Sequence, residues 1–279
     1  MLTRVDPGLR VQAEQAMRPH AVVIGAGLGG LSSAMRLGAK GYRVTVLDRL
    51  DSPGGRGSSI WENGHRFDLG PTIVTVPQVF EDLWAACGRK FRKDVTLKPL
   101  DPFYEIRWPD GSRFTARQDT DAMRAEVARL NPADAKGYDA FLKDSERRYL
   151  FGFENLGRRP MHKLWDLIKV LPTFGMLRAD RSVYTHAAKR FRDERLRMAF
   201  SFHPLFIGGD PFNVTSMYIL VSHLEKEYGV HYAMGGVDAI ARAMADVVAG
   251  QGGLVRQGAE VDEILVAGGR ASGVRLTGG

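Results

Sequence analysis

The sequence predicts an α/β protein, in which a Rossmann-like nucleotide-binding domain is interrupted by an antiparallel sheet and a helical segment. Three observations predict this class. Residues 22–48 have the pattern of a strand, a glycine-rich turn, a helix and a second strand. Residues 95–116 contain short alternating runs, and residues 119–197 have helical periodicity before α/β character returns near residue 232. With 279 residues and 44% hydrophobic content, the chain can bury a large core.

The first strand ends in a GxGxxG turn that begins at Gly25. Gly25 permits the tight turn from strand to helix, and Gly27 lets the backbone approach a diphosphate. Gly30 allows the helix to pack closely on the strand, and Gly29 lies in the same turn. The helix expected over residues 31–40 directs its amino-terminal amides at the phosphates. This order of elements predicts a bound nucleotide, with a purely structural βαβ unit as the alternative.

A carboxylate and a second glycine pair follow the turn. The strand over residues 43–48 ends in Asp48, 23 positions after Gly25, where a carboxylate can accept hydrogen bonds from ribose hydroxyls. Glycines and an arginine beyond it can bring amides and a guanidinium to a second face of a diphosphate. The alternative is a surface turn with a solvated arginine. The candidate residues after Asp48 are Arg49, Gly54, Gly55 and Arg56.

Taken together, residues 25–56 and the following FDLGP (67–71) resemble the FAD-binding start of flavin-dependent amine oxidases and carotenoid desaturases. The segments HPLFIGGDPFNVTSMY (203–218) and LEKEYGVHYAMGGVDAIARAM (224–244) are similar to bacterial phytoene desaturases. The resemblance covers nearly the whole chain from Pro19 onward. It implies FAD as cofactor and the dehydrogenation of phytoene, a hydrophobic polyene, to neurosporene or lycopene in carotenoid biosynthesis. It also implies that Val261 lies on a strand whose backbone contacts the adenine, although VDEILV is equally typical of a core strand.

Two other classes of function stay open. One is a different flavoprotein of the same superfamily, such as a later-step carotenoid dehydrogenase, a carotenoid isomerase or an amine oxidase. The other is a noncatalytic nucleotide-dependent module that binds a membrane through its arginine-rich segment. Nucleic acid is not expected as a partner, because no reader motif accompanies the positive charge. The spacing of histidines predicts no metal site.

Five segments are expected along the chain. They are a flexible tail (1–18), a first part of the FAD-binding domain (19–76), strands of the substrate domain (77–118), a helical basic and apolar insertion (119–231) and a second part of the FAD-binding domain (232–279). Expected helices cover residues 78–88, 120–130, 133–148, 161–171, 183–192 and 235–250. Expected strands cover residues 95–100, 103–108 and 112–116, in one antiparallel sheet, and then 254–256, 260–266 and 272–276. The chain ends within a predicted hairpin, and desaturases of the resembled family are longer; we therefore expect an amino-terminal portion that is inactive alone.

Charge and amphipathicity predict a membrane surface as partner. The formal net charge is +7, and residues 143–197 contain 14 Lys and Arg against 7 Asp and Glu. Within this segment MHKLWDLIKVL (161–171) has an apolar and a polar face, which suits a helix lying on an anionic membrane; a helix packed on its own domain is the alternative. No uncharged apolar run approaches the length of about 18 residues that a membrane-spanning helix needs. We expect a cytoplasmic protein attached peripherally to the inner membrane, and the single Cys87 fits a reducing compartment.

The segment over residues 198–224 is strongly apolar, with Asp210 as its only formal charge. Its aromatic and aliphatic side chains predict the wall of a tunnel for a long hydrocarbon, with ordinary core packing as the alternative. His203 and Asp210 are the polar groups that could accept a proton there, but each is more typical of a structural hydrogen-bonding or turn residue. No catalytic residue is therefore assigned.

Overall fold

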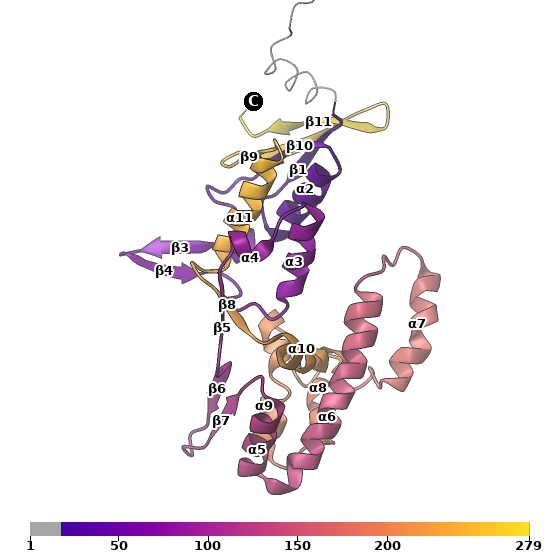
Figure 1. The fold of residues 1–279 in the computed structure, drawn as a ribbon. Coiled ribbons are helices and arrows are strands. Elements are labelled where there is room, and N and C mark those ends of the chain that lie inside the picture. Colours follow the sequence, from indigo (N-terminus) through magenta and orange to yellow (C-terminus); the bar gives the residue numbers. More distant parts are fainter. Residues whose placement is uncertain (1–17, 279) are drawn as a thin grey trace, which may run out of the picture. The chain divides into compact units, whose positions relative to one another are not determined.

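The computed structural model describes residues 18–278 and divides into two compact units (Figure 1). Unit 1 takes in the chain up to Lys98 and again from His231, and unit 2 covers Pro99–Val230. The tail expected over residues 1–18 lies outside the described residues except for Arg18. The α/β class with an interrupted nucleotide-binding domain is confirmed, because unit 2 is inserted between two segments of unit 1.

A three-stranded parallel sheet organises unit 1, in the order β1 (His20–Ile24), β2 (Arg43–Leu47) and β9 (Leu254–Arg256). Parallel neighbours need a crossover, which α2 (Leu28–Ala39) supplies between β1 and β2. The second long helix, α11 (Val237–Gly250), leads into β9. The βαβ arrangement expected at the start of the chain is therefore present.

Apolar residues at helical spacing explain how these helices pack. In α2 the buried positions are Leu31, Ala34 and Met35, three and four residues apart. They share one core with Trp84 of α3 (Pro77–Ala86) and Met244 of α11. Cys87, at the end of α3, packs partly buried against the same core. The helix α4 (Phe91–Asp94) adds Phe91, and the Trp84 Nε1–H donates to Asp94 Oδ2 at 2.7 Å.

Short two-stranded sheets complete unit 1. A hairpin is formed by β3 (Ser59–Glu62) and β4 (His65–Asp68), after the single turn η1 (Gly55–Gly57). A second antiparallel hairpin is formed by β10 (Val261–Ala267) and β11 (Arg270–Leu276), as the spacing of the last two expected strands predicts.

Unit 2 is mainly helical and encloses a separate aromatic core. Phe200 lies at its centre, with ring centroids 5.5 Å from Phe114, 5.2 Å from Phe141 and 4.6 Å from Phe191. The helix expected from Thr120 to Leu130 is confirmed, and Asp119 caps it by accepting a hydrogen bond from the Ala122 amide. The elements of unit 2 are β6 (Tyr104–Arg107), β7 (Arg113–Ala116), α5 (Thr120–Leu130), η2 (Pro132–Asp134), α6 (Ala135–Arg148), the π-helix η3 (Tyr149–Leu156), α7 (Leu164–Met176), α8 (Val183–Ala188), α9 (Glu194–Ala199), η4 (His203–Ile207), η5 (Ser216–Ile219) and α10 (Leu220–Tyr228).

One expectation about strand pairing is wrong, and two expected helices are present with different ends. The three runs between residues 95 and 116 do not form one sheet: β6 pairs with β7, whereas β5 (Leu97–Pro99) pairs with β8 (His231–Ala233). The helix expected over 183–192 ends at Ala188, because Phe191 turns back into the aromatic core. The helix expected over 161–171 begins at Leu164 and continues to Met176, through Pro172.

The division into units differs from the domain boundaries expected at residues 76 and 118. Leu83, Trp84 and Phe91 are buried in the core of unit 1, so α3 and α4 belong with the parallel sheet. The chain enters unit 2 only at Pro99, just before the β6–β7 hairpin. Among residues 18–278, no helix is both long and apolar enough to cross a membrane.

Candidate functional site

The turn after β1 is held by a backbone hydrogen bond to β2 and by close packing against α2. Gly25 has φ +100°, a conformation that L side chains rarely adopt, and its N–H donates to the Leu47 carbonyl at 2.7 Å. A Cβ atom added to Gly30 would lie 1.9 Å from the Gly25 carbonyl oxygen. Only glycine at position 30 therefore allows α2 to approach the turn this closely, as the sequence predicts.

The second glycine pair lies directly on this turn. Gly27 and Gly54 form a parallel bridge, and the Gly54 N–H donates to the Ala26 carbonyl at 2.8 Å. Gly54 and Gly55 both have positive φ, and a Cβ added to Gly55 would lie 3.3 Å from the Gly27 Cα. We call residues 25–30 together with 54–56 the glycine cradle. It brings together two segments that α2 and β2 separate in the sequence.

The cradle has the donors that a diphosphate needs. At the start of α2, Gly27 provides no side-chain cap and the first turn contains no acidic residue, so its amides have no side-chain acceptor. The partial positive charge of the helix amino terminus adds to these donors. Arg56 is exposed beside them, and no carboxylate within residues 18–278 pairs with it. These residues fit the diphosphate of a dinucleotide.

Asp48 is fixed at the edge of the cradle by backbone hydrogen bonds. Its Oδ2 accepts from the Ala26 N–H at 2.5 Å, and its Oδ1 accepts from the Leu50 N–H at 2.8 Å. Its carbonyl accepts from the Ala259 N–H at 2.7 Å, two residues before Val261, which starts β10. Each carboxylate oxygen keeps acceptor capacity for a ribose hydroxyl. Arg49 is exposed and has no partner among the described residues, so its role stays a prediction.

A charged cluster that the sequence analysis did not identify surrounds Gly236, at the start of α11. A Cβ added to Gly236 would lie 2.8 Å from the Arg66 guanidinium carbon and 2.8 Å from a carboxylate oxygen of both Asp68 and Asp238. Arg66 also donates to the Tyr232 hydroxyl. These side chains come from β4, β8 and α11, and only the fold brings them together. The packing of Gly57 against Val237 places the Gly236 cluster next to the cradle.

His203 and Asp210 both have structural partners. His203 is 2% exposed, with its Nε2 3.2 Å from Glu225 Oε2, and the Tyr104 hydroxyl donates to the same oxygen at 3.3 Å. Burial, and then the neighbouring Glu225 carboxylate, raise the pKa of Tyr104 well above its ordinary value. Asp210 is exposed and accepts from the Phe212 N–H at 2.9 Å within a turn. The structural alternative given for each residue accounts for these contacts.

The apolar segment over residues 198–224 divides between core and surface. Phe200 and Ile219 are buried in the aromatic core of unit 2, where the alternative of ordinary core packing holds. Other apolar side chains of the segment are more than half exposed, and so could line a surface for a hydrocarbon: Leu205, Phe206, Ile207 and Phe212. The hydrocarbon tunnel stays a prediction.

A second buried network that sequence reasoning missed is centred on Asp144 of α6. Asp144 Oδ2 accepts from His186 Nε2 at 3.0 Å and from Arg190 Nη2 at 2.6 Å. Burial opposes ionisation, but the hydrogen bonds from His186 and Arg190 outweigh it and lower the pKa of Asp144 to about 2. Arg148, which is also buried, donates to the Leu177 carbonyl after α7. This network joins three helices of unit 2, and no local sequence pattern signals it.

Comparison with known proteins finds one matching family model and relatives of high identity. The family model described as flavin containing amine oxidoreductase matches residues 28–279. The chain is 76% identical over 260 residues to the neurosporene-forming phytoene desaturase of Cereibacter sphaeroides, covering 93% of this chain and 50% of that protein. It is 68% identical to the protein of the same description from Rhodobacter capsulatus, covering 93% of this chain and 50% of that protein. The chain thus spans about half the length of these curated relatives.

Among solved structures, an oxidoreductase from Methanosarcina mazei aligns with a TM-score of 0.59 and 22% identity. The alignment covers 92% of this chain and 56% of that one. At this level of identity the likeness concerns the fold alone, and it supports the α/β class.

Proposed function

Because this chain belongs to the flavin-containing amine oxidoreductase family, we propose that the protein is an FAD-dependent desaturase that introduces double bonds into phytoene. The relatives at 76% and 68% identity carry the name of neurosporene-forming enzymes, which favours neurosporene over lycopene as product. The structural observation that carries the proposal is the glycine cradle, in which two glycine-rich segments and uncapped helix amides converge. The flavin cofactor expected from the sequence is confirmed by the family match.

Each part of the cradle has a proposed role toward FAD. The amides of Gly27, Gly29 and Gly30 at the start of α2, together with that of Gly55, hold the diphosphate. Gly54 fixes Gly55 against the turn, because its own N–H donates to the Ala26 carbonyl. Asp48 accepts hydrogen bonds from the adenosine ribose, and Val261 contacts the adenine through its backbone. Arg56 neutralises the phosphates, and Arg49 flanks the ribose. When bound, the flavin supplies the two-electron oxidation of the substrate, and the protein's part is to position it and exclude water.

Replacing Asp48 by alanine tests the ribose role. The Asp48→Ala change removes the acceptor of two backbone amides and of the ribose hydroxyls, so FAD affinity is expected to fall by about 30-fold, or about 2 kcal/mol. Titration of FAD fluorescence measures the affinity. Asp51→Ala is the control, because it removes the same charge from an exposed position nearby in the same loop. Equal affinities of the two variants would refute the role given to Asp48.

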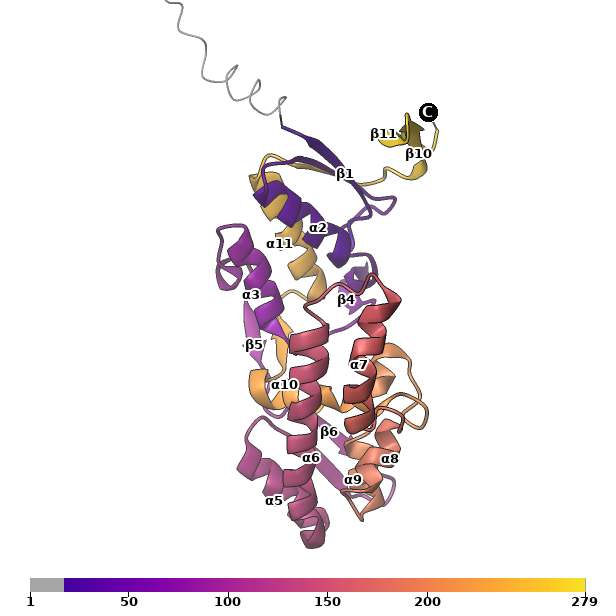
Figure 2. The same ribbon diagram turned by 90° about the vertical axis from the view of Figure 1, so that its right-hand side faces the viewer.

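We further propose that unit 2 attaches to an anionic membrane surface through α7. No residue of α7 is buried, although Phe174 packs against Phe151 of η3 with ring centroids 5.5 Å apart. Figure 2 shows the helix running beside α6. The apolar side chains Leu164, Trp165, Leu167, Ile168 and Leu171 are all more than a third exposed. Basic residues in the helix and near its ends match an anionic surface: Arg159, Lys163, Lys169 and Arg181.

The Trp165→Ala variant tests this attachment. Trp165 is 67% exposed, so its loss should leave the fold intact while removing a large apolar contact with lipid. We expect binding to vesicles that contain phosphatidylglycerol to weaken at least about tenfold in co-sedimentation. The matched control is Trp61→Ala, because Trp61 is 69% exposed but lies on β3 of unit 1. Equal weakening by both variants would contradict the role of α7.

A chimera tests the activity itself. In the full-length Cereibacter sphaeroides relative, the matching 260-residue segment is replaced by this chain. The purified chimera is then incubated with FAD, lipid and phytoene. The expected result is conversion of colourless phytoene to neurosporene, identified by its absorption spectrum and by chromatography. A chimera that binds FAD but leaves phytoene unchanged would overturn the proposal, and oxidation of amines would favour the amine-oxidase alternative.

A further inference from the structure

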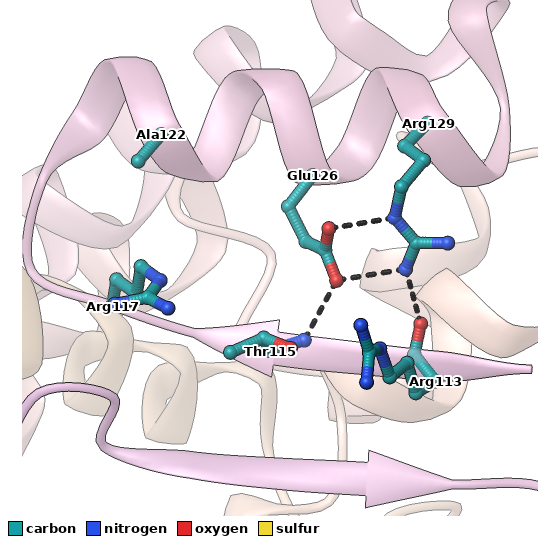
Figure 3. Close-up of a pocket in the computed structure, with 6 residues that line it drawn as sticks. All are labelled: Arg113, Thr115, Arg117, Ala122, Glu126 and Arg129. Carbon is teal, nitrogen blue, oxygen red and sulfur yellow. Dashed lines mark hydrogen bonds and ion pairs between the residues drawn. The ribbon is translucent and has the colours of Figure 1, made fainter.

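Unit 2 contains a pocket between the strand β7 and the helix α5 (Figure 3). The proposed desaturase reaction assigns no role to this pocket. Side chains alternate along β7, and Phe114 and Ala116 point into the aromatic core. Arg113 and Thr115, which alternate with them, line the pocket instead, together with residues of α5 at helical spacing. The members of this arginine pocket are Arg113 and Thr115 of β7, Arg117 directly after that strand, and Ala122, Glu126 and Arg129 of α5.

The pocket is large enough for more than solvent. Its volume is about 320 Å³, and it is open on one side. A water molecule occupies only about 30 Å³ in the liquid. Ala122, which contributes only a methyl group, lines the end of the pocket near Arg117, as Figure 3 shows. A longer side chain at position 122 would take up space at that end.

The carboxylate inside the pocket is already engaged. Glu126 Oε2 accepts from Arg129 Nε at 2.8 Å, and Glu126 Oε1 accepts from the Thr115 N–H at 2.8 Å. These hydrogen bonds, with that from Arg129 as the largest contribution, lower the pKa of Glu126. Arg129 also donates to the Arg113 carbonyl. Glu126 and Arg129 therefore brace α5 against β7, and little of the Glu126 charge is left to attract other cations.

Arg113 and Arg117 keep most of their hydrogen-bonding capacity. The carboxylate oxygen paired with Arg113 is Glu105 Oε2, at 3.9 Å, and Glu105 is itself bound by Arg107 at 2.5 Å. Arg117 pairs at 2.7 Å with Asp101, whose side chain is 71% exposed and can be displaced. Each guanidinium carries five N–H donors in a planar fork. Further out, Arg195 adds positive charge near Arg129, and Asp110 lies beside Arg195.

We propose that the arginine pocket binds a phosphate monoester group. Arg113 and Arg117 lie at opposite ends of the pocket, with Thr115 between them (Figure 3). Their long side chains can each turn a planar fork of donors toward one dianionic phosphate held between them, which a single exposed ion pair does not supply. The phosphate belongs either to a soluble ester or to the headgroup of a lipid such as phosphatidic acid. A merely solvated arginine face would bind anions weakly and without saturation.

The first experiment titrates inorganic phosphate into the full chain at low ionic strength and follows binding by calorimetry. We expect saturable binding that weakens about tenfold or more in both Arg113→Ala and Arg117→Ala. Ala122→Leu should weaken binding as well, because it takes up space at the Arg117 end of the pocket without changing any charge. The control is Arg92→Ala, which removes one positive charge from an exposed ion pair with Glu81 in unit 1.

The second experiment separates the two sources of phosphate. Vesicles with phosphatidic acid are compared with vesicles of equal charge made with phosphatidylglycerol, whose phosphate is a diester. If the lipid headgroup is the ligand, binding to phosphatidic acid is stronger and the preference is lost in Ala122→Leu. If a soluble ester is the ligand, inorganic phosphate binds and the two vesicles bind equally. Phosphate binding that is unsaturable, or unchanged in Ala122→Leu, would overturn the proposal.

Discussion

The Gly30→Ala variant is expected to lose about 3 kcal/mol of unfolding free energy. The added methyl carbon would lie 1.9 Å from the Gly25 carbonyl oxygen, which is backbone and is held by the hydrogen bond between the Gly25 N–H and Leu47. Relief of this overlap requires α2 to move away from the turn, and with it Leu31, Ala34 and Met35, which are fully buried in the core of unit 1. Urea unfolding followed by tryptophan fluorescence measures the loss, because Trp84 lies in that core.

Gly29→Ala is the matched control for this prediction. Gly29 is the preceding residue of the same helix, and a Cβ added there meets nothing within 4 Å. Alanine has a higher helix propensity than glycine, so the control is expected to be neutral or up to about 1 kcal/mol more stable. A Gly30→Ala variant as stable as Gly29→Ala would show that α2 can move away from the turn at little cost. It would contradict the claim that position 30 requires glycine.

The Asp144→Ala variant is expected to lose about 4 kcal/mol of unfolding free energy. The change leaves the buried His186 without the acceptor of its Nε2, and Arg190 without its ion pair. Removing one partner of a buried charge network costs far more than removing an exposed ion pair. Asp139→Ala is the control, since Asp139 lies on the same helix and pairs with Arg124 while 43% exposed; it should cost less than about 1 kcal/mol. Similar losses in both variants would contradict the central role of Asp144.

The pH dependence of stability gives an independent measurement on Asp144. Its folded-state pKa of about 2 lies below the ordinary value of 3.8, so its contribution is fully present above pH 3.8 and is lost as the pH falls toward 2. The contribution amounts to about 2 kcal/mol. Between pH 4 and pH 2 the stability of Asp144→Asn should therefore fall less steeply than that of the unchanged chain. Parallel curves would mean that Asp144 is not ionised in this network.

The start of the chain was predictable because local rules govern it. The order of strand, turn, helix, strand and carboxylate depends on glycine conformation and on alternation between near neighbours in the chain, and the structure places β1, α2, β2 and Asp48 accordingly. The cap at Asp119 and the end of α5 at Leu130 were predictable for the same reason. The expected helix over 161–171 was misplaced at both ends, because α7 is not anchored by burial and its ends follow local hydrogen bonds such as that between Lys163 and Asp166.

Pairings between distant segments were not predictable. The expected sheet of three consecutive runs is wrong because β5 pairs with β8, which follows only after the whole of unit 2, and a sequence of short strands does not reveal its partners. The Gly236 cluster and the Asp144 network likewise join side chains from separate elements, with no spacing that repeats. In the sequence, charged and polar residues of this kind cannot be distinguished from residues of the protein surface.

By itself the sequence determined the class of the protein and the residues of its cradle. The reason is that a backbone position with positive φ, or without room for a Cβ, requires a glycine, and glycines can be read directly from the sequence. The tertiary structure alone decided that Gly54 lies on Gly27, that Asp144 is buried among cations, and that Arg113 and Arg117 face α5 across a pocket. The physical reason is that burial and pairing over long separations depend on how whole elements pack, whereas turn and helix chemistry depends on neighbours in the chain.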